Sequence, residues 1–141
     1  METPAPDSQI RGTILLADDE KMVLDIGVQM LKRLGFNVIA VESGKKAIET
    51  FQEKNDSIDL VILDLVMPDL GGAEVVDAIK DINPDTKIML SSGYGRDANT
   101  ADLMQSCHAF IQKPFSLQKL SDKLKEILVN QRPSEICEGN C

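Results

Sequence analysis

Acidic side chains follow two strongly apolar segments of this chain, at the point where each segment ends. Asp18 and Asp19 come directly after the run 13–17, and Asp64 comes directly after the run 60–63. Runs this apolar are typical of strands in a parallel sheet that is buried on both faces, where ligands bind beyond the carboxyl ends. If the two strands are neighbours, three carboxylates repel one another unless a cation neutralises them. The sequence therefore predicts a divalent metal site.

The predicted metal site is built from oxygen ligands. Asp19 and Asp64, with Asp18 beside them, would supply carboxylate oxygens, and the backbone carbonyl of Val66 would supply a further one. Such a set suits Mg²⁺, which keeps several waters and takes oxygen ligands in an octahedron. Mn²⁺ is the alternative ion.

Asp64 is the candidate nucleophile of this site. A carboxylate can attack phosphorus and form an acyl phosphate if a metal and a second cation neutralise the incoming phosphoryl group. Lys113, after the last predicted strand, offers a flexible positive charge that can follow the phosphate. Ser92 offers a hydroxyl from the strand between. Together these groups predict phosphoryl transfer without a nucleotide-binding loop.

The segments that must position these residues alternate between strand and helix patterns. The predicted strands are 13–17, 37–41, 60–64, 87–90 and 109–112, and the predicted helices are 21–34, a helix capped by Ser43, a helix after Gly72, a weak helix at 97–105, and 116–129. Gly35 fits the C-cap of the first helix. Consecutive parallel strands need crossover helices, so the pattern predicts an α/β fold with a parallel sheet.

Length and charge limit the class of protein. The 141 residues fit one folded domain at 12–130, with polar tails at 1–11 and 131–141, and leave no room for a second output domain. A net charge of −8 disfavours direct binding to nucleic acid or to anionic membranes, so partners should be proteins. The polar N-terminus does not resemble a signal peptide, and we expect a cytoplasmic protein.

Each site residue has a simpler interpretation when taken alone. An acidic pair can cap a helix, a strand-end aspartate can cap a loop, a serine can occupy a turn, and Lys-Pro often ends an element. Their order on successive strand ends favours one site. His108 precedes a predicted strand and is not a candidate phosphohistidine. We interpret Cys107 as a small buried core residue. Cys137 and Cys141 lie in the polar tail, and we assign no role to them.

These residues resemble the receiver domain of bacterial two-component response regulators. In that family an acidic pair follows the first strand and the phosphoacceptor aspartate ends the third, which Asp18, Asp19 and Asp64 match here. A Ser or Thr that ends the fourth strand and a Lys-Pro after the fifth are matched by Ser92 and Lys113. The resemblance covers nearly the whole chain. It implies a flavodoxin-like (βα)₅ three-layer fold with a parallel sheet of order 2-1-3-4-5.

The resemblance also implies a function. Asp64 would take a phosphoryl group from the phosphohistidine of a sensor histidine kinase or a histidine phosphotransfer domain, in a Mg²⁺-dependent reaction. Such a domain promotes its own phosphorylation and dephosphorylation but has no separate turnover substrate. The sequences around Ser92 and Lys113 resemble those of receivers in hybrid sensor kinases. The length of the chain is equally compatible with a free-standing regulator. A phosphorylation-dependent homodimer is allowed, and the sequence does not define its interface.

In this family phosphorylation changes the conformation of a few switch residues. Ser92 would move to the phosphoryl oxygen, displace the loop at Tyr94, and leave space for Phe110, which holds the position of the family's switch aromatic. A phenylalanine fixed in the core is the alternative. Val66 and Tyr94 offer little to orient a water molecule, so we expect slow spontaneous dephosphorylation.

The first predicted helix is apolar nearly all round. Its apolar residues are Met22, Val23, Leu24, Ile26, Val28, Met30 and Leu31. One face cannot bury them all, so the surplus either docks against a histidine-bearing helical bundle or adds to the core.

Two other functions compete with the phosphoacceptor. Aspartyl-phosphate phosphohydrolases also use a strand-end aspartate and Mg²⁺, but they typically carry a second aspartate where this chain has Val66. A phosphorylation-independent interaction module would not need the intact set of Asp19, Asp64, Ser92 and Lys113.

Overall fold

A computed structural model describes residues 12–93, 103–105 and 107–130. Within these residues, five strands form one parallel sheet in the order β2-β1-β3-β4-β5. The strands are β1 (Thr13–Ala17), β2 (Asn37–Val41), β3 (Leu60–Asp64), β4 (Lys87–Ser92) and β5 (Ala109–Gln112). The α/β fold and the strand order predicted from the sequence are therefore confirmed.

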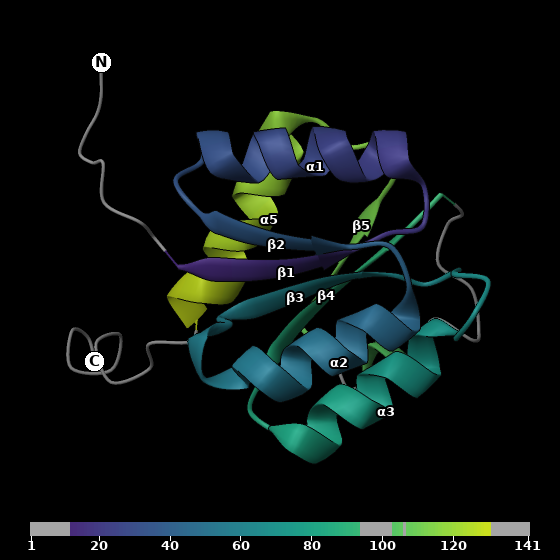
Figure 1. Cartoon of the computed structure of the whole chain (residues 1–141). Coiled ribbons are helices and arrows are strands. Elements are labelled where there is room, and N and C mark those ends of the chain that lie inside the picture. The colour runs from purple at the N-terminus through teal and green to yellow at the C-terminus, as the bar shows by residue number, and fades with distance from the viewer. Residues whose placement is uncertain (1–11, 94–102, 106, 131–141) are drawn as a thin grey trace, which may run out of the picture.

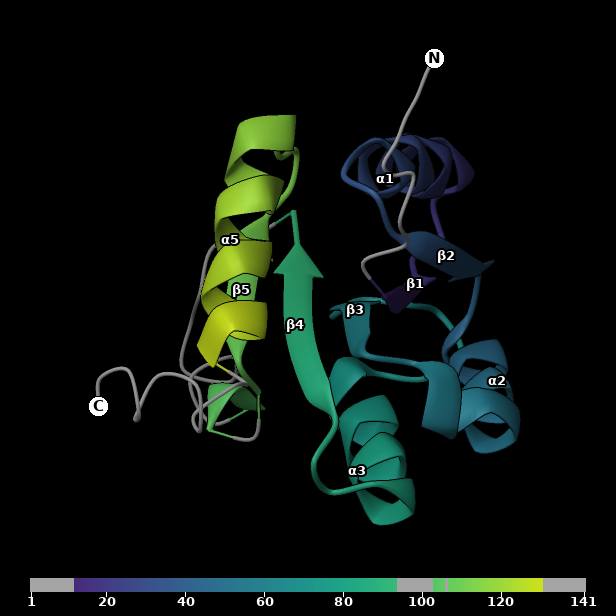
Figure 2. The same ribbon diagram turned by 90° about the vertical axis from the view of Figure 1, so that its left-hand side faces the viewer.

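Helices cover both faces of the sheet (Figure 1). They are α1 (Lys21–Arg33), α2 (Gly44–Lys54), α3 (Gly72–Ile82) and α5 (Leu117–Asn130), with a short 3₁₀ turn η2 (Asn55–Ser57) after α2. Figures 1 and 2 show α1 and α5 on one face and α2 and α3 on the other. Of the weak helix expected at 97–105, only residues 103–105 are described, and both predicted tails lie outside the described residues.

In the part of the chain that the structure describes, two hydrophobic clusters hold the helices to the sheet. Side chains of a strand alternate between its faces, so β1 sends Ile14 and Leu16 toward α1 and α5, and Leu15 and Ala17 toward α2 and α3. β3 divides its side chains in the same way. Because both faces of β1 and β3 are buried against apolar side chains, these strands are unbroken apolar runs in the sequence.

Capping residues mark the end of α1 and the start of α2, as the sequence predicts. Gly35 follows α1 with a φ of 98°, a conformation that glycine adopts without strain. The Ser43 side chain accepts a hydrogen bond from the Lys46 N–H at the start of α2. No helix among the described residues is both long and apolar enough to cross a membrane.

Candidate functional site

The acidic residues meet at the carboxyl edge of the sheet because their strands are neighbours. β1 pairs with β3 in a register that places Ala17 beside Leu63, so Asp18 and Asp64 lie side by side. Both are 3% exposed, whereas Asp19 is exposed. Carboxylate oxygens of Asp18, Asp19 and Asp64 lie within 4.8 Å of one another. The expected cluster of three carboxylates is thus present.

Lys113 brings a positive charge to this cluster. It follows β5, and its backbone N–H donates to the Ser92 carbonyl across 2.7 Å, which fixes the residue beside the end of β4. Its Nζ lies 3.0 Å from Asp18 Oδ2, 3.2 Å from Asp64 Oδ2 and 3.4 Å from Glu20 Oε1. The lysine side chain is 10% exposed, so these interactions form largely out of solvent.

The electrostatics of the cluster show in two pKa values. Burial raises the pKa of Asp64 from 3.8 to about 6, and the neighbouring Asp18 charge adds to the rise, while the Val66 N–H and Lys113 oppose it. Burial lowers the pKa of Lys113, but its hydrogen bond to Asp18 and the charges of Asp64 and Asp18 outweigh burial and leave the pKa raised. One ammonium therefore does not bring the pKa of Asp64 back to its ordinary value.

The acidic pair does not cap α1. Glu20 stands at the N-cap position without a side-chain capping bond, and Asp18 Oδ1 accepts instead from the Glu20 N–H at 2.9 Å, before the helix begins. Asp64 Oδ1 similarly accepts from the Val66 N–H at 3.2 Å. Each of these carboxylates keeps its second oxygen for Lys113. The capping interpretation does not account for this arrangement.

The other predicted site residues surround the cluster. Ser92 ends β4 and is buried, and Val66 is 59% exposed beside Asp64. A pocket of about 400 Å³ opens over the site, and Asp19, Glu20, Asp64, Val66, Gly93 and Lys113 line it. Phe110 lies on β5 opposite Leu90 and packs in the core on the α2 and α3 face. Tyr94 lies outside the described residues.

The structure adds two residues that the sequence did not single out. Glu20 contacts Lys113, and Asp69 accepts hydrogen bonds from the Gly44 and Lys45 N–H groups at the start of α2. These bonds lower the pKa of Asp69 and tie the loop after β3 to α2. The position of Glu20 directly after the acidic pair is only a weak sequence signal for a role in the site. Asp69 gives no local signal, because its partner Gly44 lies 25 residues away along the chain.

His108 and Cys107 lie away from this site. His108 stands before β5, at the opposite edge of the sheet, and its Nδ1 accepts from the Ile88 N–H at 3.2 Å. Burial, with Lys87 and Lys80 nearby, lowers the pKa of the imidazole. Cys107 is half-buried, and burial raises the pKa of its thiol to about 11, so the thiolate nucleophile is scarce at neutral pH.

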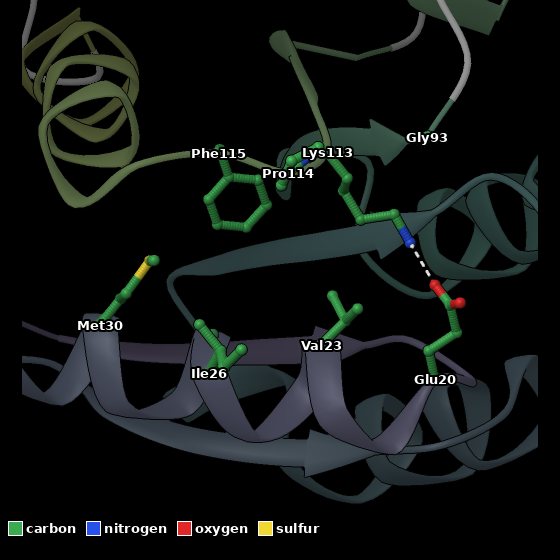
Figure 3. A pocket seen from close by; sticks show the side chains of 9 residues that line it. Glu20, Val23, Ile26, Met30, Gly93, Lys113, Pro114 and Phe115 are labelled. Carbon is green, nitrogen blue, oxygen red and sulfur yellow. Dashed lines mark hydrogen bonds and ion pairs between the residues drawn. The ribbon is translucent and has the colours of Figure 1, made fainter.

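An apolar groove of about 380 Å³ adjoins the acidic site (Figure 3). We call it the α1 groove, and its lining residues are Glu20, Val23, Ile26, Gly27, Met30, Gly93, Lys113, Pro114 and Phe115. Figure 3 shows the side chains of α1 facing Phe115 across it. Ile26 is 51% exposed, and Met22, one turn earlier on α1, is 77% exposed. The surplus apolar residues of α1 are therefore not all used in the core.

Comparisons with known proteins agree with this architecture. The chain is 35% identical over 128 residues to the sensor kinase CckA of Brucella abortus, covering 90% of this chain but only 14% of that protein. It is 32% identical over 117 residues to the response regulator receiver protein CpdR of Brucella abortus, covering 82% of this chain and 96% of CpdR. The response regulator TrrA of Thermotoga maritima, solved in complex with Mg²⁺ and BeF, is 31% identical with a TM-score of 0.74, over 82% of this chain and 98% of that one.

The family model of the response regulator receiver domain matches residues 14–125, which include the three carboxylates, Ser92 and Lys113. The family expected from the sequence is confirmed. This chain belongs to the response regulator receiver domains of two-component systems.

Proposed function

We propose that Asp64 accepts a phosphoryl group from a phosphohistidine donor and that the domain acts as a conformational switch. The observation that carries this proposal is the contact of the Lys113 ammonium with the buried Asp64 carboxylate, within a cluster of three carboxylates. A strand-end carboxylate with a lysine and two further acids has the groups that phosphoryl transfer requires.

The transfer exchanges one bond to phosphorus for another. An oxygen of Asp64 forms an O–P bond as the P–N bond to the donor histidine breaks, and the imidazole leaves with the bonding electrons. Asp64 must be ionised to attack. Lys113 lies 3.2 Å from that carboxylate and can donate to a phosphoryl oxygen bound there. Ser92 ends the neighbouring strand β4 and can add a hydroxyl donor.

The acidic cluster fits a divalent cation. Its donors are carboxylate oxygens, which Mg²⁺ and Mn²⁺ prefer. Burial, and then the neighbouring Asp18 charge, raise the pKa of Asp64, so a bound cation would favour its ionised form. Asp18, Asp19 and Asp64 would hold the ion, with the Val66 carbonyl as a further ligand. A bound Mg²⁺ would supply charge neutralisation for the phosphoryl oxygens. TrrA, a relative with the same fold, was solved with Mg²⁺ and BeF.

The conformational change after phosphorylation would involve residues of β4 and β5. We propose that Ser92 moves toward the phosphoryl group, carries Tyr94 with it, and makes room for Phe110 to turn inward. Phe110 is 9% exposed beside Leu90, so a new ring position would repack this part of the core. An unchanged Phe110 ring environment by NMR after beryllofluoride addition would exclude this movement.

Val66 argues for a long-lived phosphoryl group and against a turnover enzyme. It stands two residues after Asp64, lines the pocket over the site, and carries no acid or base that could orient water. An aspartyl-phosphate phosphohydrolase would need an acid/base there. Slow decay of the labelled protein is therefore expected, and a half-life of seconds would contradict it.

The donor would be a sensor histidine kinase or a histidine phosphotransfer domain, seated on the α1 groove. The groove is continuous with the acidic site, since Glu20, Gly93 and Lys113 line both pockets. A helical bundle with an apolar face suits the exposed side chains of α1, and it would present its phosphohistidine at Asp64. Such donors imply a cytoplasmic location, either within a hybrid kinase or as a separate regulator.

Labelling with a small phosphodonor tests the proposal without a partner. Wild-type protein incubated with radiolabelled phosphoramidate and Mg²⁺ should acquire acid-labile label, and chelation with EDTA should prevent it. Asp64→Ala should abolish labelling, while Asp56→Ala, at an exposed aspartate of η2, should not. Label that persists on the Asp64 variant, or that forms without the ion, would refute the mechanism. Failure to bind beryllofluoride would indicate an inert interaction module.

A further inference from the structure

Carboxylates engage all three hydrogen-bond donors of the Lys113 ammonium in this structure. An ammonium carries three N–H donors. Three carboxylate oxygens accept from Nζ, at 3.0 Å from Asp18, 3.2 Å from Asp64 and 3.4 Å from Glu20. Before Lys113 can donate to an incoming phosphoryl oxygen, it must therefore release one of these three partners.

Glu20 is the partner that Lys113 can release at least cost. The side chains of Asp18 and Asp64 are 4% exposed, whereas that of Glu20 is 63% exposed. A buried carboxylate that loses its cation stays out of water, which is strongly unfavourable, whereas an exposed carboxylate is rehydrated at once. The Glu20 contact is also the longest of the three, and Figure 3 shows it joining Glu20, at the start of α1, to the Lys113 ammonium.

We infer that Glu20 is a positioning residue that competes with the phosphoryl group for Lys113. The inference rests on the proposed function, because it concerns the same lysine. While Glu20 holds the ammonium, Lys113 stays over Asp18 and Asp64; when the phosphoryl group arrives, it takes the place of Glu20. Glu20 also lines the α1 groove, so a partner seated there lies next to the residue that restrains Lys113.

Beryllofluoride affinity measured at saturating Mg²⁺ tests this competition, because beryllofluoride mimics the phosphoryl group. Glu20→Gln removes the competing charge and should tighten beryllofluoride binding about two- to fivefold, the range expected for an exposed ion pair. Mg²⁺ affinity measured alone should not rise, since Gln adds no negative charge to the cluster. The Lys113 side-chain NMR signals of the beryllofluoride-free protein should shift in the variant.

Two further variants separate a contact from a change in net charge. Glu20→Asp keeps the charge but shortens the side chain by one methylene, and aspartate suits the N-cap position that residue 20 holds. It should tighten binding as Glu20→Gln does. Glu42→Gln removes an exposed charge that follows β2 at the same edge of the sheet, and it should leave the affinity unchanged.

Three outcomes would overturn the inference. Glu20→Gln could bind beryllofluoride as wild type does, Glu20→Asp could match wild type, or Glu42→Gln could shift the affinity as much as Glu20→Gln. If wild-type protein and Asp64→Ala both fail to bind beryllofluoride, the proposed function fails, and the role of Glu20 fails with it. Binding by wild type with no effect at Glu20 would overturn the role of Glu20 alone.

Discussion

The Asp64 carboxylate combines burial with proximity to a second buried acid. Burial holds its pKa near 6 in the folded protein, against about 4 in an unfolded chain. Between these two values the folded protein binds a proton that the unfolded chain has lost, so folding stability falls as pH rises from about 4 to 6 and then levels. Without a metal, the ionised Asp64 therefore destabilises the folded domain at neutral pH.

Asp64→Asn should remove this pH-dependent destabilisation. In EDTA, the variant should become more stable than wild type as pH rises from 4 to 6, with a difference of at most about 3 kcal/mol above pH 6. Urea unfolding followed by circular dichroism at several pH values measures the difference. Saturating Mg²⁺ should stabilise wild type more than the variant and narrow the gap at pH 7. A constant difference between the two proteins across this pH range would contradict the buried-charge argument.

The main site residues were predictable from sequence because each stands at the end of a strand. Asp18, Asp64 and Lys113 follow apolar runs, and parallel topology brings strand ends together whatever the exact packing. Glu20 was not predictable, since its role depends on how far the Lys113 side chain reaches. Asp69 was missed for a similar reason, because its partners begin a helix that the sequence does not place beside it.

At the scale of elements, the loop between β3 and α3 depends on close packing at Gly72. A Cβ added at Gly72 would lie 2.8 Å from the Leu65 side chain and 3.2 Å from its Cα, so backbone directly after Asp64 would have to move. The Gly72 N–H also donates to the Leu65 carbonyl at 3.2 Å. The glycine thus lets α3 begin close to the site.

Gly72→Ala should destabilise the domain and disturb the site. Overpacking of this kind costs about 1–3 kcal/mol, measurable by urea unfolding, and displacement of Leu65 should also weaken Mg²⁺ binding. Gly71→Ala is a matched control, because a Cβ there meets nothing nearer than Glu74 Oε1 at 3.8 Å and its φ of −72° suits alanine. Equal effects of the two substitutions would show that packing against Leu65 is not the cause.

Elements were predicted well wherever apolar periodicity was strong, and less well where buried positions are polar. β4 extends two residues beyond the predicted 87–90, because Ser91 and Ser92 pair with β5 although their side chains are polar. Both serines are 3% exposed at the carboxyl edge of the sheet. Apolar periodicity alone stops at Leu90, whereas the ladder to β5 keeps both serines in the strand, where the family resemblance also placed Ser92.

At the scale of the whole molecule, the sheet separates two chemically different ends. The carboxyl edge holds the carboxylates, Lys113 and the adjoining α1 groove, while His108 and a polar pocket lined by Asp59 and Asp85 lie at the amino edge. The proposed donor-docking groove and the proposed phosphoacceptor site therefore lie at one end of the molecule. Because the groove is apolar and the neighbouring site charged, substitutions can weaken docking without touching the reacting groups.

Ile26→Glu should weaken phosphotransfer from a protein donor while leaving the acidic site intact. Ile26 lines the α1 groove and is 51% exposed, so a charge fits the free protein but is desolvated when a partner covers it. With a histidine kinase that phosphorylates wild type, kcat/KM should fall about tenfold or more, whereas labelling by phosphoramidate should not change. Met22→Glu adds the same charge to α1 outside the groove lining and should have a smaller effect. If the kinase and phosphoramidate reactions slow equally in Ile26→Glu, the substitution has damaged the site and the groove is not the docking surface.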